Sequence, residues 1–260
     1  MRTISIMNLK GGTGKTTTAI NMAAILAHDY GLRVLLVDCD SQANATEFVT
    51  DGMPDTGTQG GVADLLRGEM AAIRPTNMKR VWLLPADETL MTLDVSSAGN
   101  GTADPMALAD CLSEIADDYD WCIIDCPPAF SASAMAALIA ADEVLIPMKL
   151  DAFGIRGMRN LLEQVKNMRR INAGLSVTGV LPTMRYQSEQ TEKAETELKQ
   201  ALRIYGIPLL HPIRRSAHPV DKMTFAQRPL IQSSPTSGAC RDYRCMIGDL
   251  IGEEAGQDGV

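Results

Sequence analysis

Residues 8–17 read NLKGGTGKTT and lie between an apolar run, Thr3–Met7, and a stretch of helix-forming residues, Thr16–His28. Glycines let such a loop curl so that successive backbone N–H groups point at phosphate oxygens. The start of the following helix adds partial positive charge. Lys15 would then reach the β- and γ-phosphates of a nucleotide, and the Thr16 hydroxyl would be a ligand of Mg²⁺. The nucleotide-binding residues predicted from this loop are Gly11, Gly12, Thr13, Gly14, Lys15, Thr16 and Thr17.

Apolar runs of strand length alternate with helical stretches along the chain. The predicted strands are Thr3–Met7, Arg33–Val37, Val81–Pro85, Trp121–Asp125, Val144–Pro147, Leu175–Leu181 and Pro208–Leu210. The predicted helices are Thr16–His28, Pro105–Asp117, Ser131–Ala141, Ile155–Arg170, Glu189–Tyr205 and Arg241–Gly252. This alternation predicts an α/β fold, with a mostly parallel twisted sheet and helices on both faces. We expect one domain over residues 1–252, loops over Asp38–Thr50 and Asp51–Gly61, and a frayed tail over residues 253–260.

Charge is distributed unevenly along the 260 residues, although the net charge is −8. Residues 1–148 hold 8 basic and 20 acidic side chains, whereas residues 149–244 hold 16 basic and 8 acidic ones. A basic C-terminal third can bind a polyanion even when the whole molecule is acidic. No apolar run reaches the roughly 18 residues of a membrane span, so no membrane partner is expected. The six cysteines form no C-x-x-C pair and are expected to be mainly buried thiols in a reducing cytosol.

Acidic residues follow two of the predicted strands. Asp38 and Asp40 come after Val34–Val37, and Asp125 ends the run Trp121–Asp125. Acids at the carboxyl ends of parallel strands lie at the ligand crevice of such a sheet. Asp125 therefore suits an acid that holds water on Mg²⁺. For Asp38 and Asp40, a structural role in capping a turn or a helix is the alternative interpretation.

Three segments together resemble the ParA/MinD group of ATPases. They are KGGTGKTT at residues 10–17, DCDSQANAT at residues 38–46 and DCPP at residues 125–128. The first is similar to the group's deviant Walker A motif, in which the extra lysine is Lys10. In the second, Ser41 replaces the usual proline. The resemblance extends from Thr3 to about Ile251 and implies a P-loop NTPase fold that hydrolyses ATP with Mg²⁺.

The resemblance also implies individual roles. The catalytic residues would be Lys10, Lys15 and Asp40, with Lys10 reaching the nucleotide of the other subunit in an ATP-bridged homodimer. A cation delivered in this way stabilises charge in phosphoryl transfer. Asp40 would position the attacking water. The magnesium site would comprise Thr16, Asp38 and Asp125, with Asp38 acting through the water shell.

A basic segment near the C-terminus resembles the DNA-contacting region of ParA proteins. Arg215 matches the first arginine of that pattern, and Arg214 replaces the family's proline beside it. The residues that this resemblance predicts to contact DNA are Arg185, Arg214, Arg215, Lys222 and Arg228. Binding of this kind is independent of sequence and sensitive to salt, because it depends on the release of counterions. An ordinary solvated basic face is the alternative.

The function implied is that of a ParA-type partition ATPase. Its ATP-bound dimer would bind non-specific double-stranded DNA, by avidity between two weak basic patches. A ParB-like centromere-binding protein would stimulate hydrolysis and so release the DNA. The setting implied is the nucleoid of a prokaryotic cytoplasm, for partition of a plasmid, a chromosome or a mobile element.

The sequence bears on four alternative functions. A MinD-like ATPase that cycles on membranes would end in a basic amphipathic helix, whereas residues 252–260 are acidic and glycine-bearing. A reductase like the nitrogenase iron protein would need paired cluster ligands, and Cys111 and Cys126 do not lie in that family's motifs. The intact Lys15, Thr16, Asp40 and Asp125 argue against a nucleotide-binding scaffold without activity. An ATPase that positions a protein cargo stays open, since fold and motif do not distinguish cargos.

Overall fold

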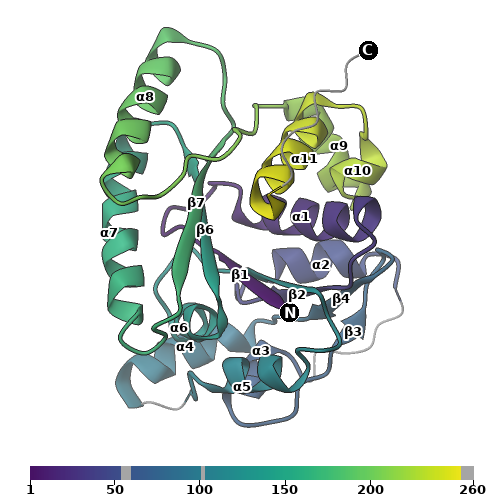
Figure 1. Ribbon diagram of the computed structural model, residues 1–260. Helices are drawn as coiled ribbons and strands as arrows, with labels where there is room; N and C mark the ends of the chain where they lie inside the picture. The colour runs from purple at the N-terminus through teal and green to yellow at the C-terminus, as the bar shows by residue number, and fades with distance from the viewer. Residues whose placement is uncertain (54–59, 101–102, 253–260) are drawn as a thin grey trace.

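The computed structural model describes residues 1–53, 60–100 and 103–252. Within them, one seven-stranded sheet has the order β3-β4-β2-β5-β1-β6-β7 (Figure 1). Every neighbouring pair is parallel except β3 with β4. The strands are β1 (Arg2–Ile6), β2 (Val34–Asp38), β3 (Arg74–Pro75), β4 (Val81–Leu84), β5 (Trp121–Asp125), β6 (Glu143–Lys149) and β7 (Ser176–Thr183).

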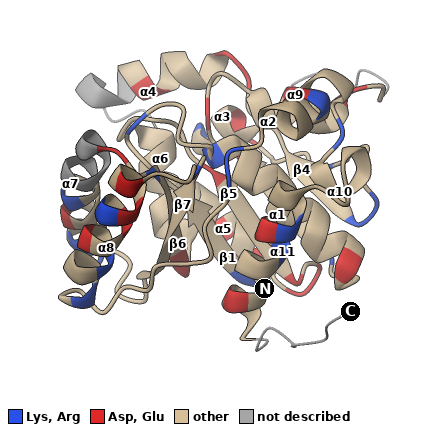
Figure 2. Ribbon diagram, turned by 90° about the horizontal axis from the view of Figure 1, so that it is seen from above, with Lys and Arg blue, Asp and Glu red and all other residues tan. Residues whose placement is uncertain are grey.

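Helices cover both faces of this sheet. One side carries α1 (Lys15–Asp29), α2 (Asn44–Thr50), α9 (Ala217–Ala226), α10 (Leu230–Ser233) and α11 (Gly238–Ile251). The other carries α3 (Val62–Leu66), α4 (Thr89–Asn100), α5 (Ala107–Glu114), α6 (Ala132–Ala140) and α7 (Ala152–Met168). The remaining helix, α8 (Glu189–Arg203), lies near α7 at the β6–β7 end of the sheet (Figure 2).

The strands are apolar because each of them is buried on two sides. Along β2, Leu35 and Val37 pack into the core beneath α3–α7, whereas Val34 and Leu36 pack into the core beneath α1 and α11. Alternate residues of a strand point to opposite faces, so both sets must be apolar. The predicted α/β class with one parallel sheet and helices on both faces is confirmed.

Two local predictions were wrong. The predicted loop Asp38–Thr50 contains helix α2, whose Ala45, Phe48 and Val49 are buried against α1 and the sheet. The predicted strand Pro208–Leu210 is only an isolated bridge between Leu209 and Val180. Proline has no N–H to donate, so a longer ladder through this segment is interrupted at Pro208.

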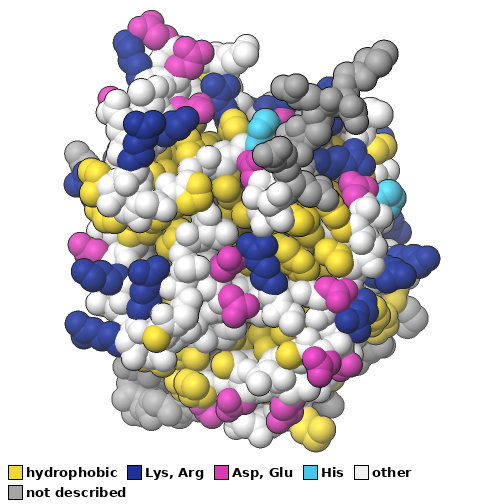
Figure 3. All heavy atoms as spheres, viewed as in Figure 1, with side chains coloured by type: hydrophobic (Ala, Val, Ile, Leu, Met, Phe, Trp, Pro, Cys, Tyr) yellow, Lys and Arg dark blue, Asp and Glu magenta, His cyan; other side chains and the backbone are white. Residues whose placement is uncertain are grey.

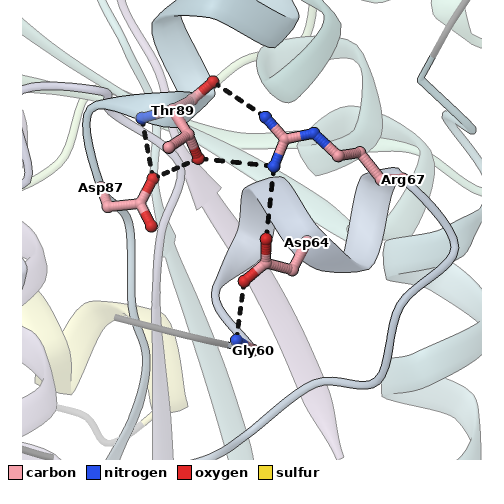
Figure 4. Close-up of polar contacts among 5 residues, drawn as sticks. All are labelled: Gly60, Asp64, Arg67, Asp87 and Thr89. Carbon is pink, nitrogen blue, oxygen red and sulfur yellow. Dashed lines mark hydrogen bonds and ion pairs between the residues drawn. The ribbon is translucent and has the colours of Figure 1, made fainter. Parts of the chain in front are cut away.

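Helices α3 and α4 and the short strand β3 were not predicted. A polar network connects α3, through Arg67 at its C-terminal end, to the start of α4 (Figure 4). Asp64 accepts a hydrogen bond from the Gly60 N–H at 2.7 Å and forms an ion pair with Arg67 at 3.3 Å. Arg67 also donates to Thr89, whose own N–H donates to Asp87 at 2.8 Å. Such contacts between segments are not visible in hydrophobic periodicity.

The surface reflects the uneven charge of the sequence. Basic side chains gather over α7 and around α9–α11, whereas α8 carries both signs (Figure 3). Acidic side chains are frequent at the lower edge, near α3 and α5 (Figure 3). Within the described ranges, no helix is both long enough and apolar enough to cross a bilayer. Most of the predicted loop Asp51–Gly61 and all of the predicted tail 253–260 lie outside the described residues.

Candidate functional site

The predicted phosphate loop connects β1 to α1, as the motif requires. Gly14 immediately precedes the helix with φ of +86°, a left-handed conformation that glycine adopts without strain. Lys15 begins α1 and is only 7% exposed. Burial lowers the pKa of Lys15, while the charges of Asp125 and Asp40 oppose this shift. The lysine therefore faces the two carboxylates with which the sequence analysis grouped it.

The acids predicted for the metal site meet at the carboxyl ends of β2 and β5. Asp38 and Asp125 are register partners in these parallel strands. Asp38 accepts hydrogen bonds from the N–H and the hydroxyl of Thr46, both at 2.9 Å, and from the N–H of Asp40 at 3.1 Å. Burial raises the pKa of Asp38 to about 6. Asp38 thus orders the start of α2, which agrees with the capping alternative, and it lies beside Asp125 at the edge of the sheet.

Asp125 is the side chain that best fits a cation. It is fully buried, and neither carboxylate oxygen accepts a hydrogen bond from a described residue. Burial and the neighbouring charge of Asp38 raise its pKa well above the ordinary value, and the nearby Thr16 hydroxyl and Lys15 ammonium oppose that shift. An unpaired buried carboxylate is costly unless something compensates it. Mg²⁺ prefers carboxylate and hydroxyl oxygens, so Asp125 and Thr16 fit this ion.

Asp40 is held at the mouth of the site. Its side chain accepts a hydrogen bond from the Gln42 N–H at 3.0 Å, and its carbonyl accepts one from Ala43 at 2.8 Å. Ala43 has φ of +51°, so the chain turns sharply between Asp40 and α2. The turn presents this 8% exposed carboxylate beside Lys15.

Lys10 does not extend away from its own subunit. Its Nζ lies 2.6 Å from Asp151 Oδ2, and both side chains are 39% exposed. A half-exposed pair of this kind is held weakly enough to exchange partners. The predicted reach across a dimer interface requires this ion pair to open.

A cavity of about 160 Å³ lies beside the phosphate loop, and the sequence analysis did not foresee it. Gly14 and Thr17 line it together with the apolar side chains of Met184, Ile213 and Val220. Its place next to the loop and its apolar side suit a flat base. Met184 has φ of +53°, an uncommon conformation for a non-glycine residue and one that can accompany a functional role.

The five predicted DNA-contacting residues divide into two groups. Arg185, Arg214 and Arg215 line a second cavity, of about 530 Å³, whereas Lys222 and Arg228 do not line it. Three of the five are engaged in ion pairs: Arg185 with Glu195 at 2.7 Å, Arg214 with Asp242 at 2.7 Å, and Arg228 with Asp51 at 3.8 Å. Among the described residues, Arg215 and Lys222 have no ion-pair partner.

Glycine at position 238 leaves room for the Arg214–Asp242 pair. A Cβ on Gly238 would lie 2.6–2.8 Å from the Arg214 side chain, which donates to both oxygens of the buried Asp242. Gly238→Ala is expected to displace Arg214 and lower the free energy of unfolding by about 1–3 kcal/mol in urea titrations, because Asp242 loses partners. Gly174→Ala is the control, since its Cβ would make only an ordinary 3.6 Å contact. Equal stability of the two variants would show that Arg214 moves without cost.

Comparison with known proteins identifies the family. The model of a family described as "AAA domain" matches residues 1–177. The chromosome-partitioning ATPase Soj of Thermus thermophilus is 34% identical over 255 residues, which cover 96% of each chain. The chain belongs to the ParA family of ATPases. ParA-family proteins are P-loop ATP hydrolases, and this chain is one of them.

Solved structures agree with this assignment. Cyanothece apo McdA superposes with a TM-score of 0.83 at 25% identity, over 96% of this chain and 99% of that one. The septum site-determining protein MinD of Pyrococcus horikoshii, complexed with Mg-ADP, has a TM-score of 0.76 at 25% identity, over 96% of this chain and 95% of that one. The ParA-family fold therefore extends over almost the whole chain, well beyond the phosphate loop.

Proposed function

We propose that this ParA-family ATPase is a switch that dimerises around ATP, binds non-specific double-stranded DNA in the ATP state, and releases it on hydrolysis. The observation that carries the proposal is a wall shared by two cavities. Arg214 and Arg215 line both the apolar cavity beside the phosphate loop and the larger basic cavity. A base bound in the first cavity would therefore touch the segment that presents cations to DNA. Two states that differ in this contact would differ in DNA affinity.

The nucleotide chemistry rests on the residues that meet at β1, β2 and β5. Lys15 and the loop amides would bind the phosphates, and Asp40 would orient the attacking water. Asp125 and Thr16 would hold Mg²⁺, with Asp38 supporting its water shell. Bound Mg²⁺ would neutralise charge that develops on the phosphate oxygens. Lys10 would leave Asp151 and reach the nucleotide of a second subunit.

The partners proposed are a second copy of the chain, DNA, and a ParB-like protein that stimulates hydrolysis. The likeness to the chromosome-partitioning ATPase Soj supports this set. Arg215 supports the DNA contact, because this exposed cation has no ion-pair partner among the described residues. We propose a nucleoid location on the same grounds, and a role in partitioning a chromosome, a plasmid or a mobile element.

Retention of the purified protein on non-specific duplex DNA tests the proposal. Retention is expected with ATP only, and it should weaken as salt rises, because counterions are released on binding. Arg215→Glu should lower the affinity by about 10-fold or more and reduce the salt dependence by about one phosphate contact. Lys15→Ala should prevent nucleotide binding, so this variant should not be retained on DNA even when ATP is present.

The matched control is Lys79→Glu, which makes the same charge change at an exposed residue before β4, at the opposite edge of the sheet. It should retain DNA as the unaltered protein does. Equal, negligible retention with ATP, with ADP and without nucleotide, together with intact ATP hydrolysis, would contradict the DNA role. A protein cargo would then be the remaining interpretation.

A further inference from the structure

A lysine outside the predicted motifs lies against the phosphate loop. Lys149 is the last residue of β6 and is half-buried. Its ammonium nitrogen is so close to the loop that a methyl group on Gly12 would lie 3.8 Å from it, an ordinary van der Waals contact. Gly12 has φ of +66°, so the loop turns at the point where Lys149 meets it. The loop thus has a cation on its flank in addition to Lys10 and Lys15.

The position of Lys149 relative to the loop is fixed by neighbouring hydrogen bonds. Asn8 donates to the carbonyl of Pro147 at 2.7 Å, which connects the start of the loop to β6. The hydroxyl of Thr183 donates to the carbonyl of Thr13 at 2.7 Å, and Thr183 is the register partner of Lys149 in β7. The ends of β6 and β7 therefore support one side of the loop, and Lys149 is held there by its strand.

Lys149 has no anionic partner among the described residues. The nearest acid along the chain, Asp151, forms its ion pair with Lys10 at 2.6 Å. A half-buried ammonium without a counter-charge loses part of its hydration and gains no ion pair in return. Such a cation beside a phosphate loop is compensated when an anion occupies the loop. A nucleoside triphosphate carries that charge.

We propose that Lys149 is a third lysine of the phosphate site, whose ammonium contacts the terminal phosphate of a nucleoside triphosphate bound in the loop. The proposal rests on the proposed function only in requiring that the loop binds a triphosphate. The four-carbon lysine stem is flexible, so the ammonium can turn from its position at Gly12 toward a bound phosphate. A contact made to the terminal phosphate is absent with a diphosphate. Lys149 would thus help the protein distinguish the two nucleotide states, which is what a switch requires.

A DNA phosphate is the competing occupant. Lys149 also lines a cavity of about 320 Å³ together with Arg185 and Arg215, which are proposed to contact DNA. The position of the Lys149 ammonium near Gly12 favours the nucleotide, because Gly12 belongs to the loop that faces the phosphates. If Lys149 contacts the nucleotide, its replacement should weaken nucleotide binding in the absence of DNA. If it contacts DNA instead, nucleotide affinity without DNA should not change.

The experiment is a titration of the full chain, without DNA and with Mg²⁺, using fluorescent ADP and a fluorescent non-hydrolysable ATP analogue. Lys149→Met should raise the Kd of the triphosphate about tenfold, and that of ADP less than about threefold, as expected for one charge-assisted contact. Lys149→Arg should restore most of the affinity. Lys79→Met is the control for loss of an exposed lysine and should match the unaltered protein.

Thermal unfolding of the nucleotide-free variants checks that they fold. The proposal is overturned if Lys149→Met binds both nucleotides as the unaltered protein does, or weakens both equally. It is also overturned if the variant loses only DNA retention, which would assign Lys149 to the DNA surface. Failure of the unaltered protein to bind the triphosphate would instead contradict the proposed function.

Discussion

Asp40→Asn is expected to slow ATP hydrolysis at least about 100-fold while nucleotide binding is retained. The asparagine oxygen can still accept the hydrogen bond from the Gln42 N–H, so the turn that leads into α2 should be preserved. What the substitution removes is the negative charge that would orient the attacking water and accept its proton. The measurement is phosphate release by the purified protein with ATP, Mg²⁺ and DNA, beside binding of a fluorescent ATP analogue.

The same variant should also prolong the ATP state. DNA retention with ATP should persist long after the unaltered protein has turned over its nucleotide and dissociated. Glu47→Gln is the matched control, because Glu47 is an exposed acid in the first turn of α2 and is not one of the residues of the proposed site. Hydrolysis by Asp40→Asn within a few-fold of the unaltered rate would show that another group orients the water.

The parts of the site that the sequence predicted are those that one segment determines. A buried strand, a glycine loop and a helix follow one another in residues 2–29, so the loop and Lys15 could be placed from local pattern alone. The convergence of Asp38 and Asp125 followed from a general rule, since parallel strands end at one edge of the sheet. Chain order and residue type were sufficient for both.

The parts that could not be predicted depend on contacts between distant segments. Lys149 reaches Gly12 from a strand more than a hundred residues further along, and the apolar cavity joins Thr17 to Ile213. Arg214 carries a charge that sequence reasoning assigned to DNA, yet Asp242 on α11 engages it. A pattern of cations does not reveal which of them are already paired.

Helix α2 was missed for a similar reason. Its seven residues are too few for a helical period to be distinguished from a loop, and isolated helices of this length are unstable. The helix forms because Asp38 accepts the N–H of Thr46 and because Phe48 and Val49 are buried. The Asp38 carboxylate, which lies beside Asp125, thus also orders the chain that presents Asp40.

Asp125→Asn is expected to stabilise the nucleotide-free protein and to abolish most of its hydrolysis. Both oxygens of Asp125 are buried without a hydrogen bond from the described residues. Asparagine remains a buried polar group but carries no charge, so the substitution should raise the free energy of unfolding by about 1–3 kcal/mol at neutral pH. Urea titrations without Mg²⁺ or nucleotide measure this difference. Asp118→Asn, at an exposed carboxylate, is the control and should change stability little.

The raised pKa values of Asp125 and Asp38 also predict how the stability of the protein changes with pH. An aspartate in the unfolded chain titrates near pH 3.8, whereas burial raises the pKa of Asp125 well above that value and the pKa of Asp38 to about 6. The folded protein therefore binds protons more tightly than the unfolded chain. Its stability should fall as the pH rises from about 4 to 6 and beyond, and this slope should be smaller in Asp125→Asn.

With Mg²⁺ and nucleotide bound, the unaltered protein should become more stable than Asp125→Asn. A ligand present at 100 times its Kd stabilises the folded state by about 2.7 kcal/mol. The unaltered protein should gain this with Mg²⁺ and a non-hydrolysable ATP analogue, while Asp125→Asn should gain much less, so their unfolding curves should cross. Equal stabilisation of both proteins would remove Asp125 from the metal site. If the order of the two unfolding curves reverses on addition of Mg²⁺ and the analogue, the Asp125 carboxylate destabilises the nucleotide-free fold but binds the cation.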